Sequence, residues 1–113
     1  MRLKSEILVA ALVRRANSDG AFAAVVKRGA DEAGAIFVKV ARLNGTADLY
    51  GPAPQTSFDQ DDSGVRLFER VMSDAPEFEV EERLKRERAF DSDLWIVEIE
   101  DRAGRHFLDL AAG

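Results

Sequence analysis

The sequence predicts an α+β domain, an antiparallel sheet of about four to five strands with two helices packed on one face. Three observations predict this class. Helix-like segments lie near residues 5–16 and 76–89, segments of alternating apolar residues lie between and after them, and Asn44-Gly45 is a strong hairpin signal. The expected order is α-β-β-β-(β)-α-β(-β). A chain of 113 residues provides for one core, so residues 1–113 are interpreted as a single globular domain.

The first helix is expected to begin at Ser5 and to end before the sequence Asn17-Ser18-Asp19-Gly20. Residues 7–13 are apolar at every position, which is more than the stripe that one packed helix face requires. Such a helix is either sandwiched within the fold or shared with a second subunit. A homodimer through the N-terminal helix is therefore one expectation, beside an unknown protein partner.

Strands are predicted at residues 22–27 and 35–42, where β-branched and apolar residues cluster or alternate. The Asn44-Gly45 turn then predicts that residues 46–50 pair back antiparallel. Residues 55–64 are polar and acidic and are interpreted as a mobile loop. Residues 65–72 fit a strand or a helix; we interpret them as a strand because their apolar positions alternate.

Pro76 is expected to start the second helix. Glu79–Arg83, Glu81–Lys85 and Glu82–Arg86 are interpreted there as exposed i,i+4 ion pairs. Residues 94–100 alternate as a strand, residues 101–104 form a turn, and residues 106–110 are expected to return as a short strand. The predicted core is Ile7, Leu8, Leu12, Val25, Ile36, Val38, Val40, Leu49, Leu84, Trp95, Val97 and Ile99.

Charge and composition restrict the function classes. The absence of cysteine excludes a disulfide framework, a thiol nucleophile and a thiolate metal site, and is typical of a reducing compartment. The apolar run at residues 7–13 resembles a signal peptide, but charged residues separate it from the small residues at 21–23, and it is too short to cross a bilayer. We therefore expect a cytoplasmic protein with no membrane partner.

The net charge of −5 is unevenly distributed. Residues 1–56 carry a net charge of +3 and residues 57–113 a net charge of −8. The overall acidity argues against a dedicated nucleic-acid-binding protein, which needs a basic footprint to neutralise phosphates. Weak association with nucleic acid through the basic N-terminal half remains an alternative, and its candidate patch is Arg14, Arg15, Lys27 and Arg28.

The candidate chemical surface lies near the C-terminus. Glu98 and Glu100 share one strand face, and His106, the chain's only histidine, follows the turn. If these three side chains converged, they would provide a ligand-binding or metal-assisted hydrolytic site. The competing interpretation places Trp95, Val97 and Ile99 in the core, with the glutamates in water and the histidine in a structural role. We favour the competing interpretation.

Other catalytic and binding motifs lack required parts. Asp59, Asp61, Ser63 and Gly64 match the start of a calcium loop, but Arg70 stands where the bidentate glutamate is needed. Gly29 and Gly34 have the spacing of a phosphate-binding loop, but the Lys-Ser/Thr pair is missing and acidic residues stand inside. One histidine and no nucleophile elbow leave no triad. The sequence therefore predicts no cofactor and favours a non-enzymatic protein.

Three segments, "ILVAALVRR", "VVKRGADEAGAIFVKV" and "FDSDLWIVEIEDRAGRHFLDL", resemble an uncharacterised family of short single-domain bacterial proteins, a domain of unknown function. The resemblance covers nearly the whole chain. It implies a stand-alone bacterial domain and carries over no activity, cofactor or catalytic residue. The leading hypothesis is a small non-catalytic interaction or accessory protein.

Overall fold

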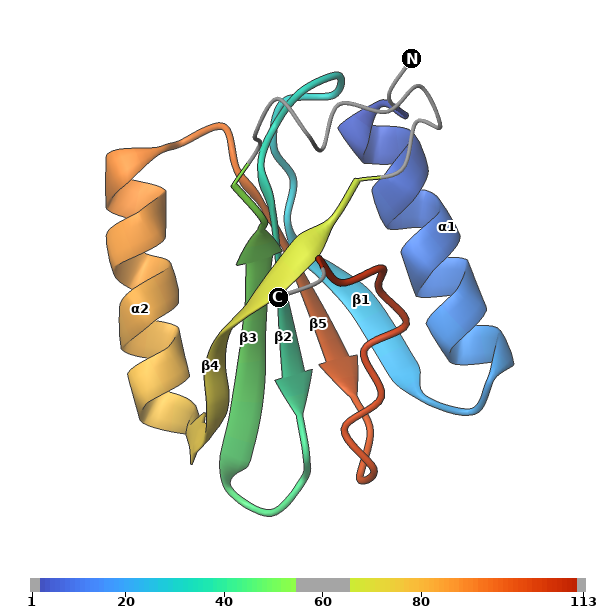
Figure 1. Cartoon of the computed structure of the whole chain (residues 1–113), viewed down its shortest axis with the longest axis vertical. Coiled ribbons are helices and arrows are strands. Elements are labelled where there is room, and N and C mark those ends of the chain that lie inside the picture. The colour runs from blue at the N-terminus through green and yellow to red at the C-terminus, as the bar shows by residue number, and fades with distance from the viewer. Residues whose placement is uncertain (1–2, 55–65, 112–113) are drawn as a thin grey trace.

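The computed structural model describes residues 3–54 and 66–111, so the predicted loop at residues 55–64 and the calcium-loop residues within it lie outside the described residues. α1 (Ser5–Ser18) and α2 (Glu77–Phe90) flank a five-stranded sheet of β1 (Phe22–Lys27), β2 (Ile36–Ala41), β3 (Thr46–Pro52), β4 (Phe68–Pro76) and β5 (Trp95–Glu100) (Figure 1). The α+β class and the element order are confirmed. Of the strand predicted at residues 65–72, residues 68–72 are confirmed as strand, and the strand continues to Pro76. No helix of the described residues is long and apolar enough to cross a membrane.

The sheet is mixed, with strand order β1-β5-β2-β3-β4. β5 pairs antiparallel with β1 but parallel with β2, while β2, β3 and β4 form an antiparallel meander that includes the pairing predicted from the Asn44-Gly45 turn. The prediction of an entirely antiparallel sheet is corrected at this one pair. Trp95, Ile96, Val97 and Ile99 are all buried, and a strand that is apolar on both faces is stable at the centre of a covered sheet.

The two helices lie on opposite faces of the sheet, which corrects the prediction that both pack on one face (Figure 1). α1 buries Val9, Leu12 and Ala16 in one apolar cluster, and α2 buries Val80 and Leu84 in another. The physical reason lies in β2, which is buried at all six positions. Because both faces of this central strand are apolar, each face requires its own helix.

Burial confirms nine of the twelve predicted core residues. Leu8 is half-buried, whereas Ile7 is 48% exposed and Val25 40% exposed, so these two are not core residues. Ile7 lies on the outer side of α1 with Ala10 and Ala11, which are also exposed. The predicted homodimer through α1 stays a prediction; the apolar outer side on which it depends is present.

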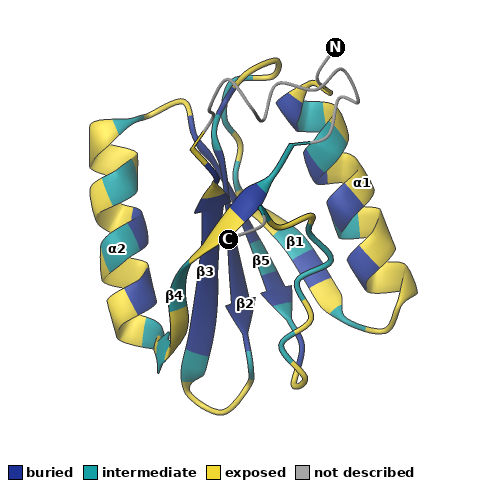
Figure 2. Cartoon of the chain, viewed as in Figure 1, coloured by how far each residue is buried: buried dark blue, intermediate teal, exposed yellow. Residues whose placement is uncertain are grey.

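The two helices cover different halves of the sheet as well as different faces. α1 packs against β1 and β5, and α2 packs against β3 and β4. On the α1 side, the C-terminal segment of residues 105–111 covers β3 and β4, where His106 lies against Tyr50 and Leu110 forms a single bridge with Phe68. That bridge replaces the predicted last strand. On the α2 side, α2 covers β5 at Ile96, which is buried in the cluster with Val80 and Leu84, but no residue of β1 belongs to that cluster. Much of β1 is coloured as exposed in Figure 2.

Candidate functional site

The uncovered corner of the sheet is the candidate site. We define the open face as the residues of β1 and β5 that point to the α2 side: Phe22, Ala24, Val26, Ile96, Glu98 and Glu100. The strand register places Phe22 opposite Glu100 and Ala24 opposite Glu98. Phe22 is 59% exposed and Val26 57% exposed, so this corner presents apolar side chains to solvent.

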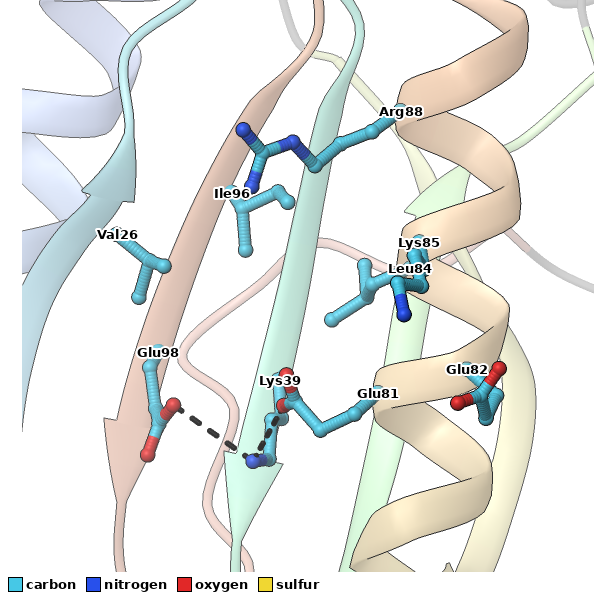
Figure 3. A pocket seen from close by; sticks show the side chains of 9 residues that line it. All are labelled: Val26, Lys39, Glu81, Glu82, Leu84, Lys85, Arg88, Ile96 and Glu98. Carbon is cyan, nitrogen blue, oxygen red and sulfur yellow. Dashed lines mark hydrogen bonds and ion pairs between the residues drawn. The ribbon is translucent and has the colours of Figure 1, made fainter.

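A groove of about 480 Å³ runs between the open face and α2 (Figure 3). Val26, Leu84 and Ile96 give it an apolar lining, and Lys85 and Arg88 project into it from α2. Figure 3 shows Arg88 reaching toward Ile96 at one end, while Glu81 and Glu98 approach Lys39 at the other. The groove is therefore apolar along its length, basic at one end and acidic at the other.

Lys39 holds the acidic end together. It projects from β2, its side chain is 7% exposed, and its Nζ lies 3.0 Å from Glu77, 2.7 Å from Glu81 and 3.7 Å from Glu98. Burial disfavours the charged amine, but the hydrogen bonds to Glu81 and Glu77 and the charges of Glu98 and Glu81 outweigh it, so the pKa of Lys39 is raised.

The pKa of Glu98, a neighbour of Lys39, is also raised. Burial raises its pKa, Lys39 opposes that shift, and the neighbouring carboxylates Glu81, Glu100 and Glu77 reinforce it. A lysine held charged is a poor nucleophile or general base, because either role requires the neutral amine. This cluster ties α2 to the sheet, with the Lys39 ammonium at the centre of its three carboxylates, and the described residues contain no group of three His, Cys, Asp or Glu side chains placed to hold a metal ion. The geometry is that of a binding groove.

The predicted site residues do not converge. Glu98 and Glu100 lie on the α2 side, in register with Lys39 and Ala41. His106 lies on the α1 side against the Tyr50 ring, and its Nδ1 accepts the N–H of Leu108 at 2.9 Å. Burial, with the charge of Arg70, lowers the pKa of His106. The sheet therefore separates the histidine from the glutamates, and the structure does not assemble the hydrolytic site that the three would form.

The candidate basic patch is divided between the two ends of α1. Arg28 lies near Glu6 and Asp31, and its guanidinium stacks over Trp95 at 4.9 Å. Lys27 donates to three backbone carbonyls, those of residues 28, 92 and 94. Arg14 and Arg15 lie more than two helical turns further along α1 from Glu6, about 12 Å away. The four cations therefore form two separate pairs.

The glycines at 29 and 34 allow a close approach of two backbone segments. A Cβ at Gly29 would lie 2.2 Å from the carbonyl oxygen of Asp93, and one at Gly34 would lie 2.5 Å from the same atom. Ala30 bonds to that carbonyl through its N–H, and its own carbonyl accepts the Trp95 indole N–H. The loop between β1 and β2 is thus fastened to the start of β5, where a phosphate-binding loop would face its ligand.

Replacing Gly29 with alanine is expected to destabilise the fold by about 2–3 kcal/mol, because the new methyl group must displace backbone that enters the central strand. Urea unfolding followed by circular dichroism measures this loss. Ala33→Ser, at an exposed position of the same loop, is the control and should change little. Unfolding of Gly29→Ala at the wild-type urea midpoint would show that the two segments do not pack this closely.

A second cavity, of about 510 Å³, lies near the start of α1 and the ends of β3 and β4. Arg66 forms part of its wall. Its guanidinium donates to the Ser5 hydroxyl at 2.8 Å and to the backbone carbonyls of Leu3 at 2.8 Å and Glu32 at 3.0 Å. This arginine fastens three chain segments to one another, which is a structural role.

Sequence reasoning missed the groove and the role of Lys39. One signal was present: Lys39 is the single charged residue within the apolar strand "IFVKVA". A lysine at such a position needs a carboxylate partner when both faces are covered. Its partners stand 38 or more residues further along the chain, so spacing alone did not identify them.

Comparison with known proteins places the chain in a family. The family described as "Protein of unknown function (DUF1491)" matches residues 3–109. No curated protein matches the chain. The solution structure of protein Atu0922 from A. tumefaciens is similar at 48% identity and a TM-score of 0.85, over 100% of this chain and 98% of that one.

Two structures from Caulobacter crescentus CB15 are also similar. The crystal structure of a DUF1491 family protein has 39% identity and a TM-score of 0.80, over 99% of this chain and 100% of that one. The NMR structure of a DUF1491 family protein has 40% identity and a TM-score of 0.79, over 99% of each chain. The chain therefore belongs to the DUF1491 family, bacterial proteins of unknown function with this α+β fold.

Proposed function

We propose that the protein is a small non-catalytic interaction module of the bacterial cytoplasm that binds another protein through the open face. The observation that carries the proposal is the uncovered corner of the sheet, where apolar side chains of β1 stand in solvent beside a groove. Contiguous exposed apolar surface with charged residues around it is typical of protein-binding sites. The cytoplasmic location is proposed because a chain without cysteine suits a reducing compartment.

The chemistry of the groove supports binding over catalysis. The buried cation is neutralised by three carboxylates, and the histidine lies on the other side of the sheet. The remaining lining is apolar or consists of exposed charges from α2. Such a surface contributes affinity through apolar contact and selectivity through its charges.

The experiment is a quantitative affinity capture from a lysate of the source bacterium. The purified protein, Val26→Glu and Phe22→Ser serve as baits, and Ile7→Glu is the matched control on the outer side of α1. Proteins retained by wild type should fall about tenfold on the two open-face variants, which corresponds to about 1.4 kcal/mol of lost binding, and persist on Ile7→Glu. Circular dichroism melting checks that each bait is folded.

The outcomes separate the candidate surfaces. Equal retention by all four baits would contradict the proposal, as would the absence of any protein above the blank matrix. Loss on Ile7→Glu alone would instead place the contact on α1, where the sequence predicted a homodimer.

A further inference from the structure

We infer that the open face binds one amphipathic helix of a partner protein, which lies beside α2 and carries an acidic side chain at one end and a basic side chain at the other. This inference rests on the proposed function and specifies its partner. It follows from the width of the uncovered sheet, the state of its edge and the distribution of unpaired charges.

The width of the open face matches one helix. Neighbouring strands lie about 4.8 Å apart, so five strands span about 19 Å, enough for two helices at the usual spacing of 8–10 Å. On the α2 side one of these two positions is taken, because α2 packs over β3 and β4. The vacant position lies over β1 and the groove beside it, next to Ile96 of β5, which α2 already buries. α2 has 14 residues and β1 has six, and both lengths correspond to about 20 Å, so a helix of about 14 residues would extend over the whole face.

The edge of β1 disfavours an extended peptide as the partner. The side-chain amide of Asn17 accepts the N–H of Ala23 at 2.9 Å and donates to its carbonyl at 3.1 Å. These are the two backbone groups that an added strand would need at this position. The register also shifts between Val25 and Lys27, which interrupts the edge further. A partner therefore gains more from the side chains of the face than from the strand edge.

The unpaired charges around the groove indicate which charge a bound helix should carry at each end. Within the described residues, no carboxylate lies within ion-pairing distance of Lys85 or Arg88 at one end of the groove. Glu100, at the other end of β5, likewise has no cation within that distance among the described residues, and Glu98 shares Lys39 with two other carboxylates. A bound helix would therefore present a carboxylate near Arg88 and an ammonium or guanidinium group near Glu100.

The test uses three synthetic 14-residue helical peptides that share one leucine–alanine stripe. The first has glutamates at one end and lysines at the other, the second has glutamates at both ends, and the third has lysines at both ends. Each is titrated into the full-length, isotope-labelled protein, and amide NMR shifts report both affinity and location. We expect the mixed peptide to bind most tightly and to shift residues 22–26, 84–88 and 96–100, leaving the Ile7 amide unchanged.

Charge reversal on the protein makes the test independent of peptide orientation. In the double variant Lys85→Glu with Arg88→Glu both ends of the groove are acidic, so the lysine–lysine peptide should become the best of the three, with the mixed peptide weakened about tenfold. In Glu100→Lys the preference should move to the glutamate–glutamate peptide. Phe22→Ser should weaken all three, and Ile7→Glu none.

Two results would overturn the inference: no saturable shifts with any peptide, or a peptide preference that the two reversals leave unchanged. In either case the capture experiment still tests separately whether the open face binds a protein at all. Loss of captured proteins on Val26→Glu would keep the open face as a binding surface for a partner that is not a helix. Unchanged capture on Val26→Glu would refute both the proposal that the open face binds a protein and the inference that this protein contributes a helix.

Discussion

Replacing Asp48 with alanine is expected to remove about 3 kcal/mol of unfolding free energy, because it deletes a fully buried carboxylate that accepts hydrogen bonds from a partly exposed arginine and from a backbone N–H. Asp48 is fully buried in β3. One carboxylate oxygen accepts Arg42 Nε at 3.1 Å and Nη2 at 2.8 Å, and the other accepts the backbone N–H of Asp74. Asp74 has φ +48°, and the pairing of β3 with β4 shifts register beside Asp48. The carboxylate therefore holds both a cation and a strained segment of the neighbouring strand.

Urea unfolding of Asp48→Ala and Asp48→Asn at about pH 7 measures the two parts of this role. Asparagine keeps an oxygen for the Asp74 N–H but loses the charge, so its loss should be smaller than that of alanine. The matched control is Glu87→Gln, which removes a surface pair with Arg83 of the same 2.8 Å length and should cost no more than about 0.5 kcal/mol. A loss for Asp48→Ala as small as that of the control would refute the structural role.

Local patterns in the sequence predict much of this fold. The hairpin at Asn44-Gly45 joins β2 and β3 as expected, and Gly45 has φ +91°, the left-handed conformation that favours glycine there. α2 begins directly after Pro76, because proline suits the start of a helix. These features depend on neighbours within a few residues, where the chemistry of each residue determines the conformation.

The arrangement of the sheet depends on pairings that local patterns do not specify. The alternation at residues 94–100 was interpreted with one core face, yet Leu94 and Ile96 make the other face apolar as well. That pattern is typical of a central strand covered on both sides. It is therefore consistent with both features that the prediction missed, the parallel pairing of β5 with β2 and the placement of the helices on opposite faces. The parallel partner of β5 is β2, which lies more than 50 residues earlier in the chain, so the sequence pattern does not specify the register between the two strands.

The candidate site was predicted least well, for a similar reason. The glutamates of α2 were interpreted as exposed i,i+4 pairs, including Glu81 with Lys85. In the structure, Glu81 instead turns to Lys39, and Arg83 pairs with Glu87. The position of His106 depends on a turn and an irregular segment that have no strand periodicity. The open face exists because α2 covers only part of the sheet, and the extent of that coverage is a tertiary property.

Replacing Lys39 with methionine is expected to destabilise the protein by about 1–2 kcal/mol at pH 7, since it keeps the aliphatic stem but leaves the partly exposed Glu77, Glu81 and Glu98 without their shared cation. Repulsion among the three carboxylates would then loosen the first turns of α2 from the sheet. Denaturant unfolding at low salt is the measurement. A second variant, Lys39→Met with Glu98→Gln, removes one of the repelling charges and should recover part of the loss.

The dependence of this loss on pH identifies its electrostatic origin. The wild-type pKa of Lys39 is raised, so its stabilising contribution is complete below the unfolded-state value near 10.5 and is lost only as the pH rises through the higher folded-state pKa. The variant lacks that contribution, and its uncompensated carboxylates, among which Glu98 already has a raised pKa, favour protonation in the folded state. Its stability should therefore increase relative to wild type as the pH falls from 7 toward 4.5. A deficit that stays constant over this interval would mean that repulsion among the carboxylates does not cause the loss, and the charge cluster would then have no part in holding α2 beside the groove.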